Sequence, residues 1–215
     1  MLKVVVFDSG YGGELFADYL SEEIPTLEIV RVIDWRNAEE LQRNARFARK
    51  LAENALRPYL GQVDLVIFAN YLLTATSLNY FRRKYKKQKF TGLALPELAL
   101  PHRPRPVVLA TAVLGKTRAF RHYVKKNHLK PFILDDWPIL IDDGELGNAK
   151  LHRDLQQVKA YNPSTIVLAC SQFSDLFPEF RRFLGHNIKI IDGFEDTLRE
   201  TEQMLGLRGI QKKKD

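Results

Sequence analysis

The sequence predicts an α/β protein with two pseudo-symmetric lobes, each a mostly parallel sheet flanked by helices, and a cleft between them. Short apolar runs alternate with amphipathic stretches, which is typical of parallel strands joined by crossover helices. In addition, residues 64–70 resemble residues 165–171, and a Phe-Arg-Arg triplet follows each stretch, at 81–83 and 180–182. The two halves therefore look like diverged copies, although any two buried parallel strands share this apolar pattern.

The expected elements alternate along the whole chain. Apolar runs predict strands near residues 3–7, 27–33, 63–69, 90–94, 107–111, 131–134, 165–169 and 188–191. The amphipathic stretches between them predict helices near residues 13–23, 38–57, 72–85, 115–126, 145–160, 175–184 and 195–205.

A proline-rich stretch divides the chain. Four prolines lie within the eleven residues 96–106, which is too dense for a helix, so we expect a linker there. We place the first lobe at residues 1–96 plus 195–215 and the second lobe at residues 97–194.

Composition excludes several classes of protein. With 215 residues, of which 45% are apolar and 27% charged, the chain is expected to fold around a sizeable core. Its single cysteine, Cys170, excludes an intramolecular disulfide scaffold and a multi-thiolate zinc site. No apolar run approaches the roughly 18 residues of a membrane helix, and the first residues lack the features of a signal peptide. We therefore expect a cytoplasmic protein without a membrane partner.

The net charge of +7 raises the question of a nucleic-acid partner. Six cations lie within residues 82–89, and three more lie at residues 212–214. Without these nine cations and the neighbouring Asp215, 24 basic and 25 acidic residues remain. The excess therefore consists of two local clusters, which favour a solvated helix end and a frayed terminus over a face that binds nucleic acid. RNA association through residues 82–89 is the alternative.

A polar, glycine-rich loop follows the first predicted strand. Residues 7–13 read Phe-Asp-Ser-Gly-Tyr-Gly-Gly and open a helix, where backbone amides could receive an anion. A dinucleotide site is not favoured, because Leu15 stands at the third glycine position and Asp8 places a carboxylate where a pyrophosphate needs positive charge. Asp8 and Ser9 at a strand end suit proton transfer or recognition of an amino group.

Cys170 is the candidate base or nucleophile. It ends an apolar strand, and the equivalent strand of the first half ends at Ala69, so the two residues are expected on opposite walls of a cleft. A thiol near a helix amino terminus can have a lowered pKa. The alternative is a structural thiol, because free cysteine is among the most often buried residue types and no histidine lies near Cys170 in the sequence.

The other titratable groups give less specific signals. The five histidines lack the spacing of a zinc hydrolase, so no metal site is expected. His102 borders the linker, where it either reaches the cleft or is solvated. Asp142 and Asp143 precede Gly144 in an expected cleft loop. Such paired acids can divide acid and base roles, although adjacent acids in a turn more commonly face water.

Together these motifs resemble the aspartate/glutamate racemase superfamily, and the glutamate racemases in particular. Residues 7–13 look like the family's opening motif, Phe-Asp-Ser-Gly-x-Gly-Gly. Residues 66–70 resemble its first cysteine motif, Val-Ile-Ala-Cys-Asn, and residues 167–173 its second, Val-Leu-Gly-Cys-Thr-His-Tyr. Further matches in the family's order are a Thr motif at 109–111, an acidic loop at 142–144 and a strand at 190–192.

The resemblance implies a reaction without a cofactor, in which two cysteines on opposite faces of the substrate α-carbon remove and return a proton. Here Ala69 stands at the first cysteine position, and Gln172 replaces the histidine beside the second. Tyr71 replaces a threonine and is expected to intrude on the pocket. A methyl group cannot carry a proton, so Ala69 cannot do the work of the first catalytic cysteine. The resemblance therefore implies that the substrate-binding residues are better kept than the catalytic ones.

We therefore expect a racemase-like isomerase, resembling glutamate or aspartate racemase and impaired in two-base racemisation, that acts without a cofactor on a small amino acid or dicarboxylate. One alternative is a single-cysteine lyase, because the arylmalonate decarboxylases of this superfamily keep only the second cysteine. Another is a binding protein that has lost catalysis; a homodimer is left open. The catalytic candidates are Cys170 and Asp8, and the substrate-binding candidates are Ser9, Asn70, Thr111, Ser171, Gln172 and Asp142.

Overall fold

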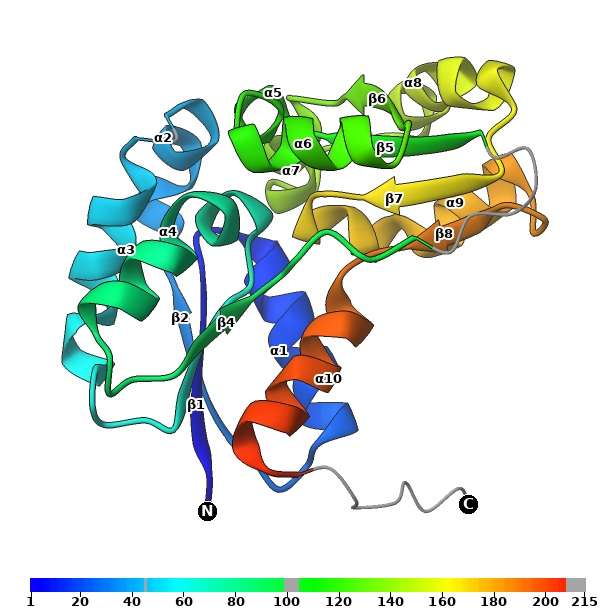
Figure 1. The fold of residues 1–215 in the computed structure, drawn as a ribbon. Helices are drawn as coiled ribbons and strands as arrows, with labels where there is room; N and C mark the ends of the chain where they lie inside the picture. Colours follow the sequence, from blue (N-terminus) through cyan, green and yellow to red (C-terminus); the bar gives the residue numbers. More distant parts are fainter. Residues whose placement is uncertain (45, 99–104, 208–215) are drawn as a thin grey trace.

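The computed structural model describes residues 1–44, 46–98 and 105–207. Figure 1 shows two lobes, each built around a four-stranded sheet that is flanked by helices. Every strand pair within the two sheets is parallel. The predicted fold class, two α/β lobes with parallel sheets, is confirmed.

The first lobe consists of β1 (Lys3–Asp8), α1 (Tyr11–Glu23), β2 (Glu28–Ile33), η1 (Trp35–Asn37), α2 (Ala38–Arg43), α3 (Ala48–Leu56), η2 (Arg57–Tyr59), β3 (Leu65–Phe68), α4 (Tyr71–Lys84), β4 (Phe90–Gly92) and α10 (Phe194–Leu205). The strand order is β2-β1-β3-β4. β1 and β3 are nearly continuous runs of buried apolar residues, because helices cover both faces of the sheet. In Figure 1, α1 and α10 lie on one side of the sheet, and α3 and α4 lie on the other.

The second lobe consists of β5 (Pro106–Ala110), α5 (Ala112–Gly115), α6 (Arg118–Lys126), β6 (Lys130–Ile133), α7 (Trp137–Asp142), α8 (Asn148–Tyr161), β7 (Thr165–Leu168), η3 (Ser171–Leu176), α9 (Phe177–Leu184) and β8 (Lys189–Ile191). The strand order, β6-β5-β7-β8, repeats that of the first lobe. In both lobes the strand that begins the lobe lies beside the third strand in sequence, so the two sheets have the same connectivity.

The two lobes share part of one hydrophobic core. Along β5, Val107 and Leu109 belong to a cluster with α8 and α9, whereas Val108 and Ala110 belong to the cluster that fills the first lobe. This alternation follows from the two-residue period of a strand. One face of the second sheet is therefore buried together with the core of the first lobe.

Three predicted helices differ from the observed ones. The expected helix at 38–57 is broken into α2 and α3, and the one at 115–126 into α5 and α6. At the second break, the Thr117 hydroxyl accepts a hydrogen bond from the Phe120 N–H and caps a new helix. The helix expected from residue 175 is preceded by a 3₁₀ helix, η3.

The expected loop before Gly144 is in fact a short helix, α7, and Asp142 is its last residue. Trp137 begins this helix and is fully buried, while its indole N–H donates to Asp154 at 2.9 Å. Pro138 stands in the first turn, where a missing N–H costs no helical hydrogen bond. Burial of Trp137 thus holds the start of this short helix against the core of the second lobe.

After the second lobe the chain returns to the first, where α10 packs against β4, β3 and α1. This return agrees with the proposed lobe boundaries, which stay a prediction. Most of the proline-rich linker and His102 lie outside the described residues. No helix within the described ranges has both the length and the apolar composition needed to cross a membrane.

Candidate functional site

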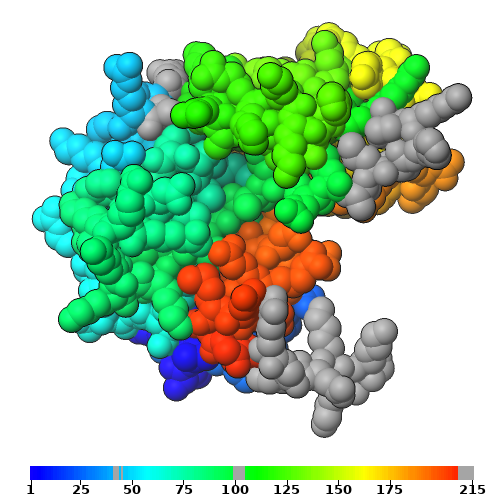
Figure 2. Space-filling view, in the orientation of Figure 1, coloured from blue at the N-terminus to red at the C-terminus, as the bar shows by residue number. Residues whose placement is uncertain are grey.

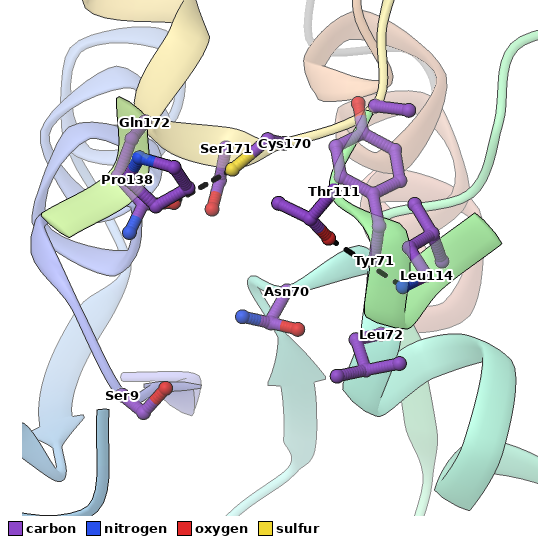
Figure 3. Close-up of a pocket in the computed structure, with 11 residues that line it drawn as sticks. Ser9, Asn70, Tyr71, Leu72, Thr111, Leu114, Pro138, Cys170, Ser171 and Gln172 are labelled. Carbon is purple, nitrogen blue, oxygen red and sulfur yellow. Dashed lines mark hydrogen bonds between the residues drawn. The ribbon is translucent and has the colours of Figure 1, made fainter. Parts of the chain in front are cut away.

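A small pocket of about 40 Å³ lies where the two lobes meet, at the carboxyl ends of the central strands. Figure 3 shows its side chains, with Asn70 and Thr111 pointing toward the same space as Cys170 and Ser171. Six of the eight predicted site residues line it. The described lining residues are Ser9, Asn70, Tyr71, Leu72, Thr111, Leu114, Pro138, Ala169, Cys170, Ser171 and Gln172.

Asp8 lies directly behind this pocket. It is the last residue of β1 and is only 1% exposed. Its carboxylate accepts hydrogen bonds from the Ser9 N–H at 2.6 Å, from the Asn70 amide at 2.8 Å and from the Ser171 hydroxyl at 3.3 Å. Asp8 thus connects a first-lobe wall residue, Asn70, to a second-lobe wall residue, Ser171.

Burial raises the pKa of Asp8 from 3.8 to about 7. The hydrogen bonds from Ser9, Asn70 and Ser171 act in the opposite direction, and the negative charge of Asp142 adds to the increase. Near neutral pH this carboxyl group therefore exists in both protonation states. A group with that property can both donate and accept a proton.

The second acid, Asp142, forms a chain of contacts that ends at the thiol. Its carboxylate accepts from the Tyr11 N–H at 3.0 Å and from the Gln172 amide at 3.3 Å. The Gln172 carbonyl in turn accepts from the Cys170 thiol at 3.0 Å. Burial raises the pKa of Asp142 as well. Gln172 therefore orients the thiol and joins it to an acid from α7.

The thiol of Cys170 is not activated by its position. Burial raises its pKa, and the negative charges of Asp8 and Asp142 raise it further, whereas hydrogen bonds from the backbone of Gln172 and Phe173 lower it. The element that follows is the six-residue 3₁₀ helix η3. The lowered pKa considered for a thiol at a helix amino terminus is therefore not found, and the thiol is protonated near neutral pH.

The first-lobe counterpart of Cys170 is Asn70, not Ala69. The N–H of Ala69 donates to the Phe7 carbonyl at 2.8 Å, just as the N–H of Ala169 donates to the Leu109 carbonyl at 2.9 Å. The expected pairing of Ala69 with Cys170 is thus wrong by one residue.

The backbone after these two alanines confirms the corrected register. Asn70 has φ −144° and ψ 123°, and Cys170 has φ −146° and ψ 128°, so both are extended residues that immediately precede a helix. Ala69 is fully buried in the core and is not among the residues that line the pocket. The amide of Asn70, rather than a methyl group, therefore lies on the wall that matches the thiol.

The glycines of residues 7–13 allow the two lobes to approach each other closely. A Cβ atom at Gly12 would overlap the side chain of Ser171, and one at Gly10 would lie 2.8 Å from Asp142 and from Gln172. Gly13 leaves no room for a Cβ atom beside Asp8. Gly10 and Gly12 are thus explained by the close approach of the two lobes, and Gly13 by packing against β1 and β2 within the first lobe.

Tyr71 closes the other end of the pocket, as its substitution for threonine predicted. Its hydroxyl accepts a hydrogen bond from the Gly193 N–H at 2.6 Å, and burial raises its pKa well above the usual value. No motif pointed to the apolar lining residues Leu72, Leu114 and Pro138. Their positions follow from helix starts in the two lobes, which only the three-dimensional arrangement brings together.

The fold places the chain beside a group of solved racemase structures. Solved structures with a similar fold include glutamate racemases and an aspartate racemase. The chain superimposes on glutamate racemase from Escherichia coli, solved with L-glutamate and an activator, with a TM-score of 0.85, 19% identity and coverage of 95% of this chain and 82% of that one. Aspartate racemase from Picrophilus torridus superimposes with a TM-score of 0.62, 13% identity and coverage of 95% and 94%.

The curated relatives that the chain resembles are glutamate racemases. The protein from Clostridium novyi is 26% identical over 204 residues, which cover 89% of this chain and 79% of the relative. The protein from Microcystis aeruginosa is 25% identical over 223 residues, which cover 96% and 77%. No protein-family model matches the chain. The resemblance stated from the motifs is confirmed: the chain is a homologue of glutamate racemases, which are isomerases.

Proposed function

We propose that the chain is a cofactor-independent isomerase of the racemase type that acts at the α-carbon of a small amino acid or dicarboxylate. Cys170 exchanges a proton with that carbon, and Asp8 supplies or removes protons through Ser171. The groups that bind the substrate are the polar side chains and backbone amides of Ser9, Asn70, Thr111, Ser171 and Gln172, with Asp142 holding Gln172 in place.

The observation that carries this proposal is the single thiol at a strand end, facing a ring of hydrogen-bonding groups from both lobes. Among the described lining residues none is Arg, Lys or His, so a carboxylate would be held by hydroxyl, amide and N–H donors. A pocket of about 40 Å³ holds little more than water. Entry of a dicarboxylate therefore requires the lobes to move apart.

The protonation states support donation of a proton by the thiol. Because burial raises its pKa, Cys170 is neutral near pH 7 and is suited to protonate a carbanion. Asp8, with a pKa of about 7, can replace that proton, since the Ser171 hydroxyl lies 3.3 Å from its carboxylate. Ser171 lines the pocket beside Cys170, so Asp8 can exchange protons with the pocket through this hydroxyl, and such a route needs no second thiol.

A one-face reaction is the second candidate, and the identity of Asn70 favours it. An amide neither gives nor takes a proton near neutral pH, yet it occupies the position that matches Cys170. Protonation from one side alone would produce a lyase similar to a decarboxylase, or racemisation that is slower by about 10² to 10⁴ than with two positioned bases.

The test is α-proton exchange in heavy water, with L- and D-glutamate and L- and D-aspartate as substrates. Proton NMR follows loss of the α-proton signal, and chiral chromatography follows inversion. We expect exchange that disappears in Cys170→Ala and is slowed in Asp8→Asn. Circular dichroism of both variants checks that the fold is kept.

The outcomes separate the candidates. Exchange with inversion supports a racemase, and exchange with retention supports the one-face reaction. Exchange that persists in Cys170→Ala would contradict both assignments of the thiol. Ligand-induced thermal stabilisation without exchange, for any of the four substrates, would identify a binding protein that has lost catalysis.

A further inference from the structure

The pocket around Cys170 has a polar side and an apolar end. Ser9 and Gln172 lie on the polar side, whereas Tyr71, Leu72 and Leu114 form the apolar end. Figure 3 shows these three side chains grouped together, across the pocket from Ser9 and Gln172. Tyr71 and Leu72 begin α4, and Leu114 belongs to α5, so both lobes contribute to the apolar end.

Tyr71 is fixed in its position at the apolar end. It is buried, and its hydroxyl accepts the hydrogen bond from the Gly193 N–H at 2.6 Å. A Cβ atom at Gly193 would overlap the Ala94 carbonyl oxygen, so Gly193 packs against the segment that follows β4. The hydroxyl of Tyr71 is therefore held where the two interlobe connections meet, and its ring is left to line the pocket.

Most polar side chains of the pocket are already paired with the acids behind it. The Ser171 hydroxyl and one N–H of the Asn70 amide donate to Asp8. The Gln172 amide donates to Asp142. These three side chains therefore have little capacity left for a charged ligand.

Three donors remain among the described side chains that line the pocket. They are the hydroxyls of Ser9 and Thr111 and the second N–H of the Asn70 amide, none of which donates to another described group. A carboxylate has about four lone-pair sites. The three donors therefore suffice for one carboxylate and not for two.

A second carboxylate on the substrate would meet the apolar end. Its burial there is costly, because the remaining donors are already used and the described lining residues include no cation. The negative charges of Asp8 and Asp142, which are close enough to raise the pKa of Cys170, would also repel it. A methyl or ethyl group in the same place is stabilised by burial.

We propose that this pocket prefers an amino acid with a single carboxylate and a short apolar side chain, such as alanine, and that the Tyr71 ring limits the length of that side chain. Glutamate and aspartate are then poorer substrates. The inference rests on the proposed function, because it assigns a substrate class to the same site.

The size of the pocket supports this preference. In Figure 2 the teal surface of the first lobe lies against the green surface of the second lobe. A pocket of about 40 Å³ holds little more than water, so the lobes must separate to admit any amino acid. The separation required is smallest for a methyl side chain.

The test compares α-proton exchange of alanine, norvaline, aspartate and glutamate in heavy water, with both enantiomers of each. The side chain of norvaline is about as long as that of glutamate but carries no carboxylate, so it separates the effect of length from that of charge. We expect kcat/KM for alanine to exceed the values for norvaline and for glutamate by at least about tenfold.

Tyr71→Thr removes the ring and is expected to lower the preference for alanine over norvaline by at least about tenfold. Tyr71→Phe is the matched control, because it keeps the ring and removes only the hydrogen bond to Gly193. Its preference is expected to equal that of the unaltered chain. Leu114→Ala enlarges the same end from the second lobe and is expected to act as Tyr71→Thr does, so a folding defect in one variant does not decide the result.

The outcomes distinguish this inference from the proposed function. Exchange of glutamate as fast as that of alanine would overturn the inference and leave the proposed function standing. An alanine preference that is unchanged in both Tyr71→Thr and Leu114→Ala would overturn the role of the apolar end. Absence of exchange with every amino acid would contradict the proposed function instead, and thermal stabilisation by the same amino acids would then decide the inference. Stronger stabilisation by alanine than by glutamate supports it, and equal, reversed or absent stabilisation overturns it.

Discussion

The two lobes place different residues at the same backbone position. Asn70 and Cys170 both follow a central strand, have nearly equal backbone angles and precede a helix. The Asn70 side chain accepts from the Leu73 N–H at 3.0 Å and so caps α4, while its amide donates to Asp8. The Cys170 side chain forms no such cap; its thiol donates to the Gln172 side chain, and the backbone N–H groups of Gln172 and Phe173 approach the sulfur.

This difference shows how a duplicated fold separates stability from reactivity. In the first lobe the strand-end residue completes a helix and fixes an acid, so its side chain is committed to structure. In the second lobe the equivalent residue forms only weak hydrogen bonds, because a thiol is a poor donor and a poor acceptor. The position that contributes least to local structure is the one that is free to react.

The largest expected effect comes from Asn70→Cys, which makes the two strand ends chemically alike. If the corrected register holds, the new thiol lies on the pocket wall opposite Cys170 and can act on the other face of the substrate. We expect inversion of glutamate or aspartate to increase by about 10² or more, since a positioned acid or base contributes that much. Chiral chromatography measures the change.

Ala69→Cys is the matched control for this experiment. Ala69 is buried in the core and lies outside the pocket, so a thiol there should add no inversion. If Ala69→Cys gains inversion and Asn70→Cys does not, the register assigned from the strands is wrong. The comparison between the two lobes would then have to be shifted by one residue.

A second prediction concerns the contact that brings the lobes together. Gly12→Ala would place a methyl group on the side chain of Ser171 and force α1 away from η3. Overpacking of this kind costs about 1–3 kcal/mol, and the separation should also reduce any exchange activity. Chemical denaturation measures the loss, and Gly147→Ala, where a Cβ atom meets nothing within 4 Å, should leave stability nearly unchanged.

A third prediction follows from the raised pKa of Asp8. An acid whose pKa is about 7 when folded and 3.8 when unfolded binds more protons in the folded state between these values. The free energy of unfolding therefore decreases as the pH rises from about 4 to 7. Asp8→Asn should remove this part of the decrease, and denaturation at pH 5 and pH 8 compares the variant with the unaltered chain. Equal pH dependence of the two proteins would contradict the raised pKa.

The smallest expected effect separates the two strand-end residues by stability alone. Asn70→Ala removes the cap of α4 and is expected to cost about 1 kcal/mol. Cys170→Ala removes no cap and should cost less. The ratio of the two losses, measured by urea denaturation, tests whether structure and reactivity are divided between the lobes. A larger loss for Cys170→Ala would argue against that division.

The fold was predictable because its strands are short apolar runs separated by amphipathic stretches, a pattern that depends only on local sequence. Two features depended on tertiary contacts and were missed. α7 forms because Trp137 is buried against Phe173 and Phe180, which are distant in sequence. The sequence could not show which residue after β3 is equivalent to Cys170. An alanine at a strand end, such as Ala69, fits either a buried or an exposed position.

The candidate site shows the same limit. Motifs located six of the residues that line the pocket, but they placed Asp8 and Asp142 in the pocket itself rather than behind it. The apolar lining residues Leu72, Leu114 and Pro138 belong to no motif. Each is buried only because three helices from two lobes converge there.

The cations are grouped differently along the sequence and in the fold. The cations of residues 82–89 are adjacent in the chain, but in the fold Arg82 pairs with Glu200 at 3.0 Å, Lys84 pairs with Glu53, and Lys89 donates to the Met204 carbonyl at 2.7 Å. Four other cations, Arg46, Arg49, Lys116 and Arg118, are spread over more than seventy residues of sequence and line one cleft only because the lobes meet.

The return of α10 to the first lobe has a mechanical consequence. Because β1 begins and α10 ends on the side of the first lobe that faces away from the second, as Figure 1 shows, the second lobe is held by two connections and carries neither of these elements. A pulling force applied through β1 and α10 would act on the first lobe. Such a force would pull α10 away from β4 and α1 before it acted on the sheet of the second lobe.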